Sequence, residues 1–420
     1  MLWLLLSLLQ VCTGLPTRLS LAPSDELTED RTWAKAAIGK LWQERLEMNH
    51  TPLVWLKYPA RPDVEIVFKD ESSTRTGSLK HRYALMLMMW ALREGKILEG
   101  TPVFEASSGN TANSLAYMCK LVGVNFTAIC PDTLEPIKQL HIEEHGGTVF
   151  RVPISERLKK AKELADENGG FFMNQFGNAD RAEDFHESGN YRLESANLFH
   201  ELLLQLRGYT TDSKKIPQMF VHAAGTGGTI SSVGRYVRKY GFETEIVLAD
   251  TQFSIYFDYV RHHLFTNESG SAQWQNPGMA GIGYGPMGPA KHGETTSLDA
   301  GVIDRVLKIP DLASTAGMTV LRNQGLSGGP STGVNFVAAL HLAAKERPDK
   351  KKPLLIATIL ADQGVNYESS YYNRTWIGDN FKKHGGIKSF DCWVDVLQRA
   401  LVEPLDPLNV GPQHCGTGSF

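Results

Sequence analysis

Short, mainly apolar runs recur along the chain between residues 64 and 360. Polar or turn-forming residues bound each run, and runs of this length predict strands buried on both faces. The predicted strands are Val64–Phe68, Pro102–Ala106, Phe126–Cys130, Thr148–Val152, Gln218–Ala223, Glu245–Ala249 and Leu354–Leu360.

Stretches with apolar residues at helical spacing lie between these runs and predict helices. They begin near Trp33, Leu79, Thr111 and Pro136, and two more span Glu156–Asn168 and Ile230–Tyr240. This alternation predicts an α/β fold of parallel sheets covered by helices on both faces. Ligands of such sheets bind at the carboxyl ends of the strands, so the loops that follow the strands are where chemistry is expected.

The two ends of the chain lack this alternation. Residues 1–14 are apolar, end in small residues and fall short of the ~20 residues that span a bilayer, so they predict a cleaved secretory signal. A cytoplasmic protein is the alternative. Residues 15–31 are polar and are interpreted as a linker, and residues 265–290 as a long loop. Periodicity is lost after Phe390, so residues 391–420 are interpreted as a tail.

Composition adds a few constraints. Hydrophobic residues make up 42% of the 420 residues and charged residues 21%, as in a globular protein with a sizeable core. The formal net charge is -3 and no long basic run occurs, so no nucleic-acid partner is expected.

No CxxC pair occurs among the five cysteines. Cys119 and Cys130 are expected to be buried thiols, whereas Cys392 and Cys415 could form a disulfide in an exported protein.

A lysine stands where the helix after the first strand begins, in Thr76-Gly-Ser-Leu-Lys80-His-Arg82. The positive end of the helix dipole and partial burial both disfavour its charged form. A neutral amine is what Schiff-base chemistry requires. A solvated lysine near a helix start is the alternative interpretation.

A polar loop, Ser107-Ser108-Gly109-Asn110-Thr111, joins the next strand to its helix. Hydroxyls and backbone N–H groups at a helix N-terminus bind anions, which suits a substrate carboxylate. Asn110 offers both a donor and an acceptor. An ordinary helix cap is the alternative.

A glycine-rich loop, Gly225-Thr226-Gly227-Gly228-Thr229, follows a later strand. Its glycines let the backbone approach a phosphate, and its threonines add hydroxyl donors. The loop has neither the GK[ST] of a Walker loop nor the GxGxxG of a dinucleotide site, so a cofactor with one phosphate fits best and a packing turn is the alternative. The last motif, Gly328-Gly-Pro-Ser331-Thr332-Gly333, by itself fits an ordinary helix cap.

Taken in order, these motifs resemble the cysteine synthase and cystathionine β-synthase family of enzymes that use pyridoxal 5′-phosphate (PLP), known as fold type II. The resemblance covers roughly residues 35–375. It is closest to bacterial L-cysteine desulfhydrases, through KDESSTRTGSLKHR, EASSGNTA, NQFGNADRAEDF, AAGTGGT and GPSTGVN. It implies two parallel-sheet domains with PLP between them in residues 32–390, the smaller at about 85–190, and a homodimer.

The resemblance also implies roles for residues. Lys80 would bind PLP as a Schiff base and move the Cα proton, and Asn110 would bond the 3′-oxygen of the cofactor. Ser331 would face the pyridine nitrogen, and the Gly225–Thr229 loop would hold the phosphate. The substrate carboxylate would be bound by Ser107, Ser108, Gly109, Thr111 and Gln175.

A neutral hydroxyl at Ser331 cannot hold a proton on the ring as a carboxylate would, and the weaker electron sink suits β-elimination. The resemblance to the desulfhydrase subgroup then predicts the function, an L-cysteine desulfhydrase that yields sulfide, pyruvate and ammonia. A β-replacement synthase making L-cysteine from O-acetylserine or serine and sulfide is the main alternative. A threonine or serine dehydratase and an inactive secreted binding protein are the others. His81, Pro330 and Thr332 depart from the synthase pattern, which has Asp and GISSG there.

Overall fold

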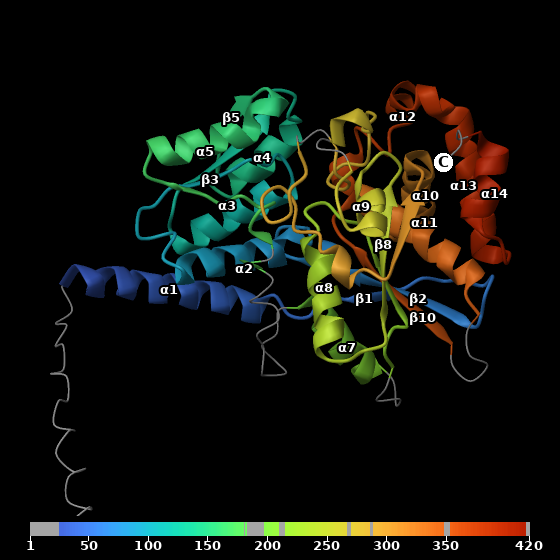
Figure 1. The fold of residues 1–420 in the computed structure, drawn as a ribbon, viewed down its shortest axis with the longest axis horizontal. Coiled ribbons are helices and arrows are strands. Elements are labelled where there is room, and N and C mark those ends of the chain that lie inside the picture. The colour runs from blue at the N-terminus through green and yellow to red at the C-terminus, as the bar shows by residue number, and fades with distance from the viewer. Residues whose placement is uncertain are drawn as a thin grey trace, which may run out of the picture.

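The computed structural model describes residues 25–179, 181–182, 197–209, 215–266, 270–285, 289–347 and 353–416. The signal predicted for residues 1–14 lies outside these ranges. The described chain forms one six-stranded and one four-stranded sheet with helices around them (Figure 1). The predicted α/β class with parallel sheets is confirmed.

The six-stranded sheet has the order β1-β2-β10-β7-β8-β9. Neighbouring strands are parallel, except that the short edge strand β1 runs antiparallel to β2. The carboxyl ends of β2, β10, β7 and β8 therefore lie along one edge of the sheet. The strands are β1 (Leu53–Trp55), β2 (Val64–Asp70), β7 (Met219–His222), β8 (Glu245–Thr251), β9 (Arg305–Ile309) and β10 (Leu354–Leu360).

The four-stranded sheet has the order β5-β4-β3-β6, and its neighbouring strands are all parallel. It takes its strands from residues 103–172, inside the segment 85–190 that was assigned to a smaller subdomain. The strands are β3 (Val103–Glu105), β4 (Phe126–Pro131), β5 (Thr148–Val152) and β6 (Phe171–Phe172).

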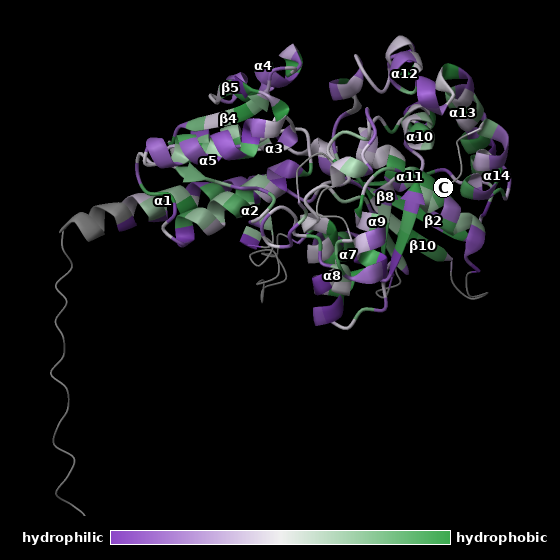
Figure 2. Cartoon of the chain, turned by 45° about the horizontal axis from the view of Figure 1, so that its top comes forward, coloured by the Kyte–Doolittle hydropathy of each residue, from purple (hydrophilic) through white to green (hydrophobic). Residues whose placement is uncertain are grey.

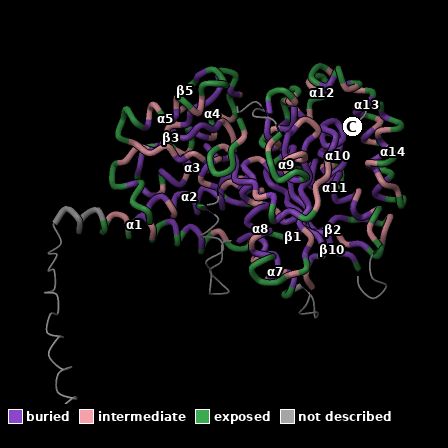
Figure 3. The backbone as a smooth tube through the Cα atoms, in the orientation of Figure 1, coloured by how far each residue is buried: buried purple, intermediate pink, exposed green. Residues whose placement is uncertain are grey.

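Helices cover both faces of each sheet. α10, α11 and α13 share a core with one face of the six-stranded sheet, and α7, α8 and α9 share another core with its opposite face. α1, α2 and α3 cover one face of the four-stranded sheet, and α5 covers the other. Buried residues are concentrated in the strands and the inner helices (Figure 3). The outer helices carry many hydrophilic residues (Figure 2).

These helices have the following bounds. The α-helices are α1 (Asp25–Glu47), α2 (Lys80–Arg93), α3 (Asn110–Val122), α4 (Pro136–Glu144), α5 (Arg157–Glu167), α7 (Leu198–Tyr209), α8 (Gly228–Lys239), α9 (Tyr256–His262), α10 (Asp311–Asn323), α11 (Pro330–Lys345), α12 (Arg374–Asn380), α13 (Gly386–Val402) and α14 (Pro407–Cys415). Short 3₁₀ turns are Glu71–Ser73, Ile154–Glu156, Gly270–Ala272, Ala300–Val302, Gly364–Tyr367 and Lys382–His384.

Helices occupy parts of the two segments that were interpreted as a linker and a tail. α1 begins at Asp25, inside the predicted linker, and α13 and α14 occupy most of the predicted tail. The tail prediction was wrong because Phe390, Trp393 and Leu397 follow helical spacing and bury one face of α13 against the core.

Cysteines follow the expectation from the sequence. Cys392 in α13 and Cys415 in α14 form a disulfide, with their Cα atoms 5.5 Å apart. Cys119 and Cys130 are buried free thiols. Within the described ranges, no helix combines the length and the apolar content that crossing a membrane requires.

Candidate active site

Lys80 is the first residue of α2 and is half-buried. The backbone just before it is bound to the end of β10. The Leu79 N–H donates to the carbonyl of Ala361 at 2.7 Å, and Ser78 forms an antiparallel bridge with Asp362. The lysine predicted to bind PLP is therefore held at the carboxyl ends of β2 and β10.

Asn110 opens α3 and reaches the same place. Its Nδ2 donates to Oδ2 of Asp362 at 2.7 Å, and the Tyr367 hydroxyl donates to the same oxygen at 2.6 Å. Asp362 is 3% exposed. Burial raises its pKa, although Tyr367, Asn110 and the charge of Lys80 oppose the rise. No motif in the sequence marks Asp362, and its one signal is an acidic residue just after an apolar strand.

Ser331 lies in the first turn of α11, and the loop before it packs on the end of β10. Gly328 pairs with Gln363 in an antiparallel bridge. A Cβ at Gly329 would lie 2.3 Å from Oδ1 of Asp362, so the close approach of this loop requires glycine. The loops of Lys80, Asn110 and Ser331 thus meet around the end of β10.

The Gly225–Thr229 loop follows β7, the strand next to β10, and leads into α8. Gly227 has φ +88°, and a Cβ there would lie 2.3 Å from the Leu298 nitrogen. A Cβ at Gly225 would lie 2.3 Å from the Gly281 carbonyl oxygen. The first N–H groups of a helix have no partner within it, so they can bind an anion. This cradle, with a lysine and an amide donor at adjacent strand ends, fits PLP.

Two of the predicted carboxylate ligands bond to each other. The Thr111 hydroxyl donates to Oε1 of Gln175 at 2.7 Å, while Nε2 and the backbone N–H of Gln175 donate to Glu105 at 3.2 Å each. Glu105 is fully buried, and burial raises its pKa to about 7 despite the hydrogen bonds from Gln175. Because Thr111 and Gln175 bond to each other, the groups that can bind a substrate carboxylate here are the Ser107 and Ser108 hydroxyls and the first N–H groups of α3.

His222, the last residue of β7, is a second functional candidate that no motif marks. Oδ1 of Asn335 accepts from the Ala223 N–H at 2.8 Å, so Nδ2 of Asn335 faces Nδ1 of His222 at 3.2 Å and the Ile359 carbonyl at 3.0 Å. Nδ1 of His222 therefore accepts, which assigns the ring proton to Nε2. Burial and then the charge of Lys80 lower the pKa of His222 to about 3, so its ring is neutral.

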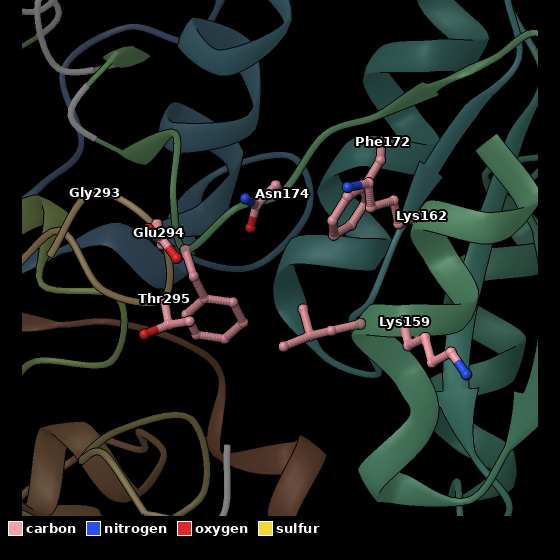
Figure 4. A pocket seen from close by; sticks show the side chains of 9 residues that line it. Lys159, Lys162, Phe172, Asn174, Gly293, Glu294 and Thr295 are labelled. Carbon is pink, nitrogen blue, oxygen red and sulfur yellow. The ribbon is translucent and has the colours of Figure 1, made fainter. Parts of the chain in front are cut away.

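A cavity of about 400 Å³ lies beside Gln175, between α5 and residues 293–295 (Figure 4). Asn174 and Phe176, which flank Gln175 in the chain, both line it. Ser297 ties this wall to the phosphate loop, because its hydroxyl donates to the Phe176 carbonyl and its N–H to the Thr226 carbonyl, both at 2.8 Å. The complete lining is Leu158, Lys159, Lys162, Phe172, Asn174, Phe176, Gly293, Glu294 and Thr295.

Comparison with known families agrees with this geometry. The profile of the family described as pyridoxal-phosphate dependent enzyme matches residues 45–358, and the chain belongs to that family. The chain is therefore an enzyme whose cofactor is PLP.

Three individual proteins with similar sequences are compared with this chain. The chain is 46% identical over 405 residues to F13B12.4 of Caenorhabditis elegans, named provisionally as pyridoxal-phosphate dependent, which covers 95% of this chain and 93% of that protein. It is 33% identical over 356 residues to L-cysteine desulfhydrase Cds1 of Mycobacterium tuberculosis, covering 83% and 90%. It is 29% identical over 326 residues to a cysteine synthase of Staphylococcus aureus, covering 76% and 93%.

Solved structures share the fold. A hydrogen sulfide-producing enzyme from Fusobacterium nucleatum matches with a TM-score of 0.63 and 23% identity over 80% of this chain and 92% of that chain. An O-ureido-L-serine synthase matches with a TM-score of 0.63 and 23% identity, over 77% and 92%. The predicted fold type II class and the family resemblance are confirmed.

Proposed function

We propose that the chain catalyses β-elimination from L-cysteine and releases sulfide, pyruvate and ammonia. The observation that carries the proposal is the meeting of the Lys80, Asn110 and Ser331 loops at the end of β10, with the glycine cradle on the neighbouring strand β7. The 33% identity to an L-cysteine desulfhydrase supports this choice of reaction.

PLP bound at this site supplies an electron sink for the Cα of an amino acid. The first N–H groups of α3 and the hydroxyls of Ser107 and Ser108, in the loop before it, hold the substrate carboxylate, which orients Cα toward Lys80. Lys80 then takes the Cα proton as the thiol leaves from the β-carbon.

A cysteine synthase is the second candidate, supported by the relative from Staphylococcus aureus at 29% identity. A synthase would use the same lysine, phosphate cradle and carboxylate site. The two reactions differ in what reaches the β-carbon after the leaving group departs, so products decide between them.

The test uses the purified protein loaded with PLP. Sulfide and pyruvate formed in equal amounts from L-cysteine alone support the lyase. If the protein instead forms L-cysteine from O-acetylserine and sulfide and releases no pyruvate from L-cysteine, the enzyme is a synthase and the lyase proposal is wrong. A protein that holds PLP but turns over neither substrate would contradict both.

Lys80→Ala tests the assignment of the catalytic lysine. We expect it to abolish the visible absorption of bound PLP and to lower kcat by several orders of magnitude. Lys96→Ala, at an exposed lysine just beyond α2, is the matched control and should leave both unchanged. Full activity in Lys80→Ala would overturn the assignment.

We also propose that the enzyme is a homodimer. Trp42 and Leu46 support this proposal, because they lie four residues apart on α1, share one face and are 39% and 69% exposed. Light scattering should give twice the mass of the chain, and Leu46→Asp should shift the protein toward monomer. A wild-type protein that stays monomeric at high concentration would exclude the dimer.

Finally, we propose that the chain enters the secretory pathway. The apolar residues 1–14 support export, and so does the Cys392–Cys415 disulfide, since disulfides persist in oxidising compartments. Sequencing the N-terminus of the protein from its native source should show cleavage near Gly14. An intact Met1 would argue for the cytoplasm.

A further inference from the structure

Asp362 is a buried carboxyl group in the middle of the site. Its Oδ2 accepts from Asn110 at 2.7 Å and from Tyr367 at 2.6 Å, and its Oδ1 lies against Gly329. Burying a carboxylate is unfavourable unless its partners compensate. Those partners include Asn110 and the charge of Lys80, both from the proposed PLP site, which points to a role in that site.

The orientation of the Asn110 amide has chemical consequences. An asparagine amide has donors on one end and an acceptor on the other, and its shape allows either end to face a ligand. An ionised carboxylate only accepts hydrogen bonds. Asp362 in its ionised form therefore binds Nδ2 of Asn110 and excludes the flipped amide, which would bring two oxygens together.

We propose that Asp362 is a positioning residue that fixes Nδ2 of Asn110 toward the cofactor. Nδ2 carries two hydrogens, and the bond to Asp362 uses one of them. The second remains for the 3′-oxygen of PLP, which carries negative charge in the form that absorbs visible light. The inference rests on the proposed site, and it adds to that site a residue that acts through Asn110.

Tyr367 supports Asp362 from the other side. Burial and the neighbouring carboxylate of Asp362 raise the pKa of Tyr367 well above its ordinary value, so its hydroxyl stays a donor. Tyr367→Phe removes this donor and leaves the bond between Asp362 and Asn110 in place. This variant therefore distinguishes the effect of disturbed packing around Asp362 from the effect of a changed orientation of the Asn110 amide.

The experiment measures the absorption spectrum and PLP affinity of the full chain. Asp362→Asn keeps the size of the side chain but can face Asn110 with a donor, which permits the flipped amide. We expect absorption to move from the visible to the near-ultraviolet band and PLP to bind about tenfold more weakly or worse, the effect of one hydrogen bond to a charged group. Tyr367→Phe should keep the spectrum and change the affinity about twofold at most.

A double-variant cycle decides whether Asp362 acts through Asn110. In an Asn110→Ala background, Asp362→Asn should have no further effect on the band ratio or on affinity. An equal spectral shift in both backgrounds would overturn the proposal, as would an unchanged spectrum in Asp362→Asn alone. If that variant fails to fold when judged by circular dichroism, Asp362→Ala replaces it, because it also removes the carboxylate acceptor, and an unchanged spectrum there contradicts the proposal.

These readouts do not depend on sulfide release. A protein that holds PLP with a visible band but leaves L-cysteine intact would refute the desulfhydrase proposal while the Asp362 cycle still gives a result. An enzyme that releases sulfide yet shows no coupling between Asp362 and Asn110 would refute this inference alone.

Discussion

Arg82 and Glu201 form an ion pair at 2.8 Å with both side chains withdrawn from solvent. Glu201 also binds Lys69 at 2.7 Å, and Arg82 binds Glu71 at 2.9 Å. Burial alone would raise the pKa of Glu201, but Arg82 and Lys69 hold it well below its ordinary value. Because Arg82 follows Lys80 by two residues, the pair fixes the first turn of α2 to α7.

Glu201→Gln should destabilise the protein strongly, because it leaves Lys69 and Arg82 buried without their shared counter-charge. We expect the free energy of unfolding to fall by about 3–5 kcal/mol in urea denaturation. Asp391→Asn is the control, since it breaks an ion pair with Arg374 that lies in solvent. If the free energy of unfolding falls by the same small amount in both variants, the buried ion pairs of Glu201 do not stabilise the fold as expected.

Glu105→Gln should improve binding of the substrate carboxylate at neutral and higher pH. An amide at this position can donate to Oε1 of Gln175, which turns Gln175 and frees the Thr111 hydroxyl for the substrate. We expect KM for L-cysteine to drop up to about tenfold at pH 8, the value of one charged hydrogen bond, with kcat little changed.

The same argument predicts a pH dependence in the wild-type enzyme. Burial raises the pKa of Glu105 to about 7, so its protonated form, which Glu105→Gln imitates, is present below pH 7. The ratio of wild-type to Glu105→Gln KM should therefore fall toward one as the pH decreases through 7. Thr111→Val should abolish the difference between the two, and a ratio that is constant with pH would contradict the mechanism.

Asp311→Asn should change how stability depends on pH. Burial, reinforced by the charge of Asp250, raises the pKa of Asp311 from 3.8 to about 7. Between these values the folded state binds a proton that the unfolded chain releases, so this group's stabilising contribution is present at low pH and is lost as the pH rises to about 7. Asp311→Asn lacks this loss, which for one proton is at most about 1.4 kcal/mol per pH unit.

Urea denaturation of both proteins at pH 5, 6, 7 and 8, in about unit steps, measures how this contribution to stability changes across the titration of Asp311. The stability of wild type relative to Asp311→Asn should decrease from the lowest pH to the neutral range. Asp379→Asn, at an exposed position of α12, is the control and should follow wild type. Parallel curves for wild type and Asp311→Asn would show that Asp311 stays ionised in the fold.

Cys392→Ser should loosen the C-terminal helices. The disulfide joins residues 23 positions apart, and opening a loop of this size costs about 3 kcal/mol of stability. A thiol reductant should lower the melting temperature of wild type toward that of Cys392→Ser and leave the variant unchanged. Equal melting temperatures for wild type with and without reductant would mean that the bond does not stabilise the fold.

The sequence alone determined the α/β class and predicted four loops for the site. Strand and helix periods are local, and parallel strands place the loops after them at one edge of a sheet. Lys80, Asn110, Ser331 and the Gly225–Thr229 loop could be named as candidates because their motifs, taken together, resemble one PLP-dependent family. Short edge strands such as β1 and β6 could not be named, because they form through pairing and carry too few residues for a pattern.

The tertiary structure alone decided which side chains control those loops. Asp362 meets Asn110 across 252 positions of the chain, and Glu201 meets Lys69 across 132. Likewise, His222 acquires its tautomer from Asn335 on another element. Hydrogen bonds and burial of this kind depend on distance in space, and no local pattern encodes them. The sequence thus predicted where the chemistry lies, whereas packing set the orientations of the side chains at that place.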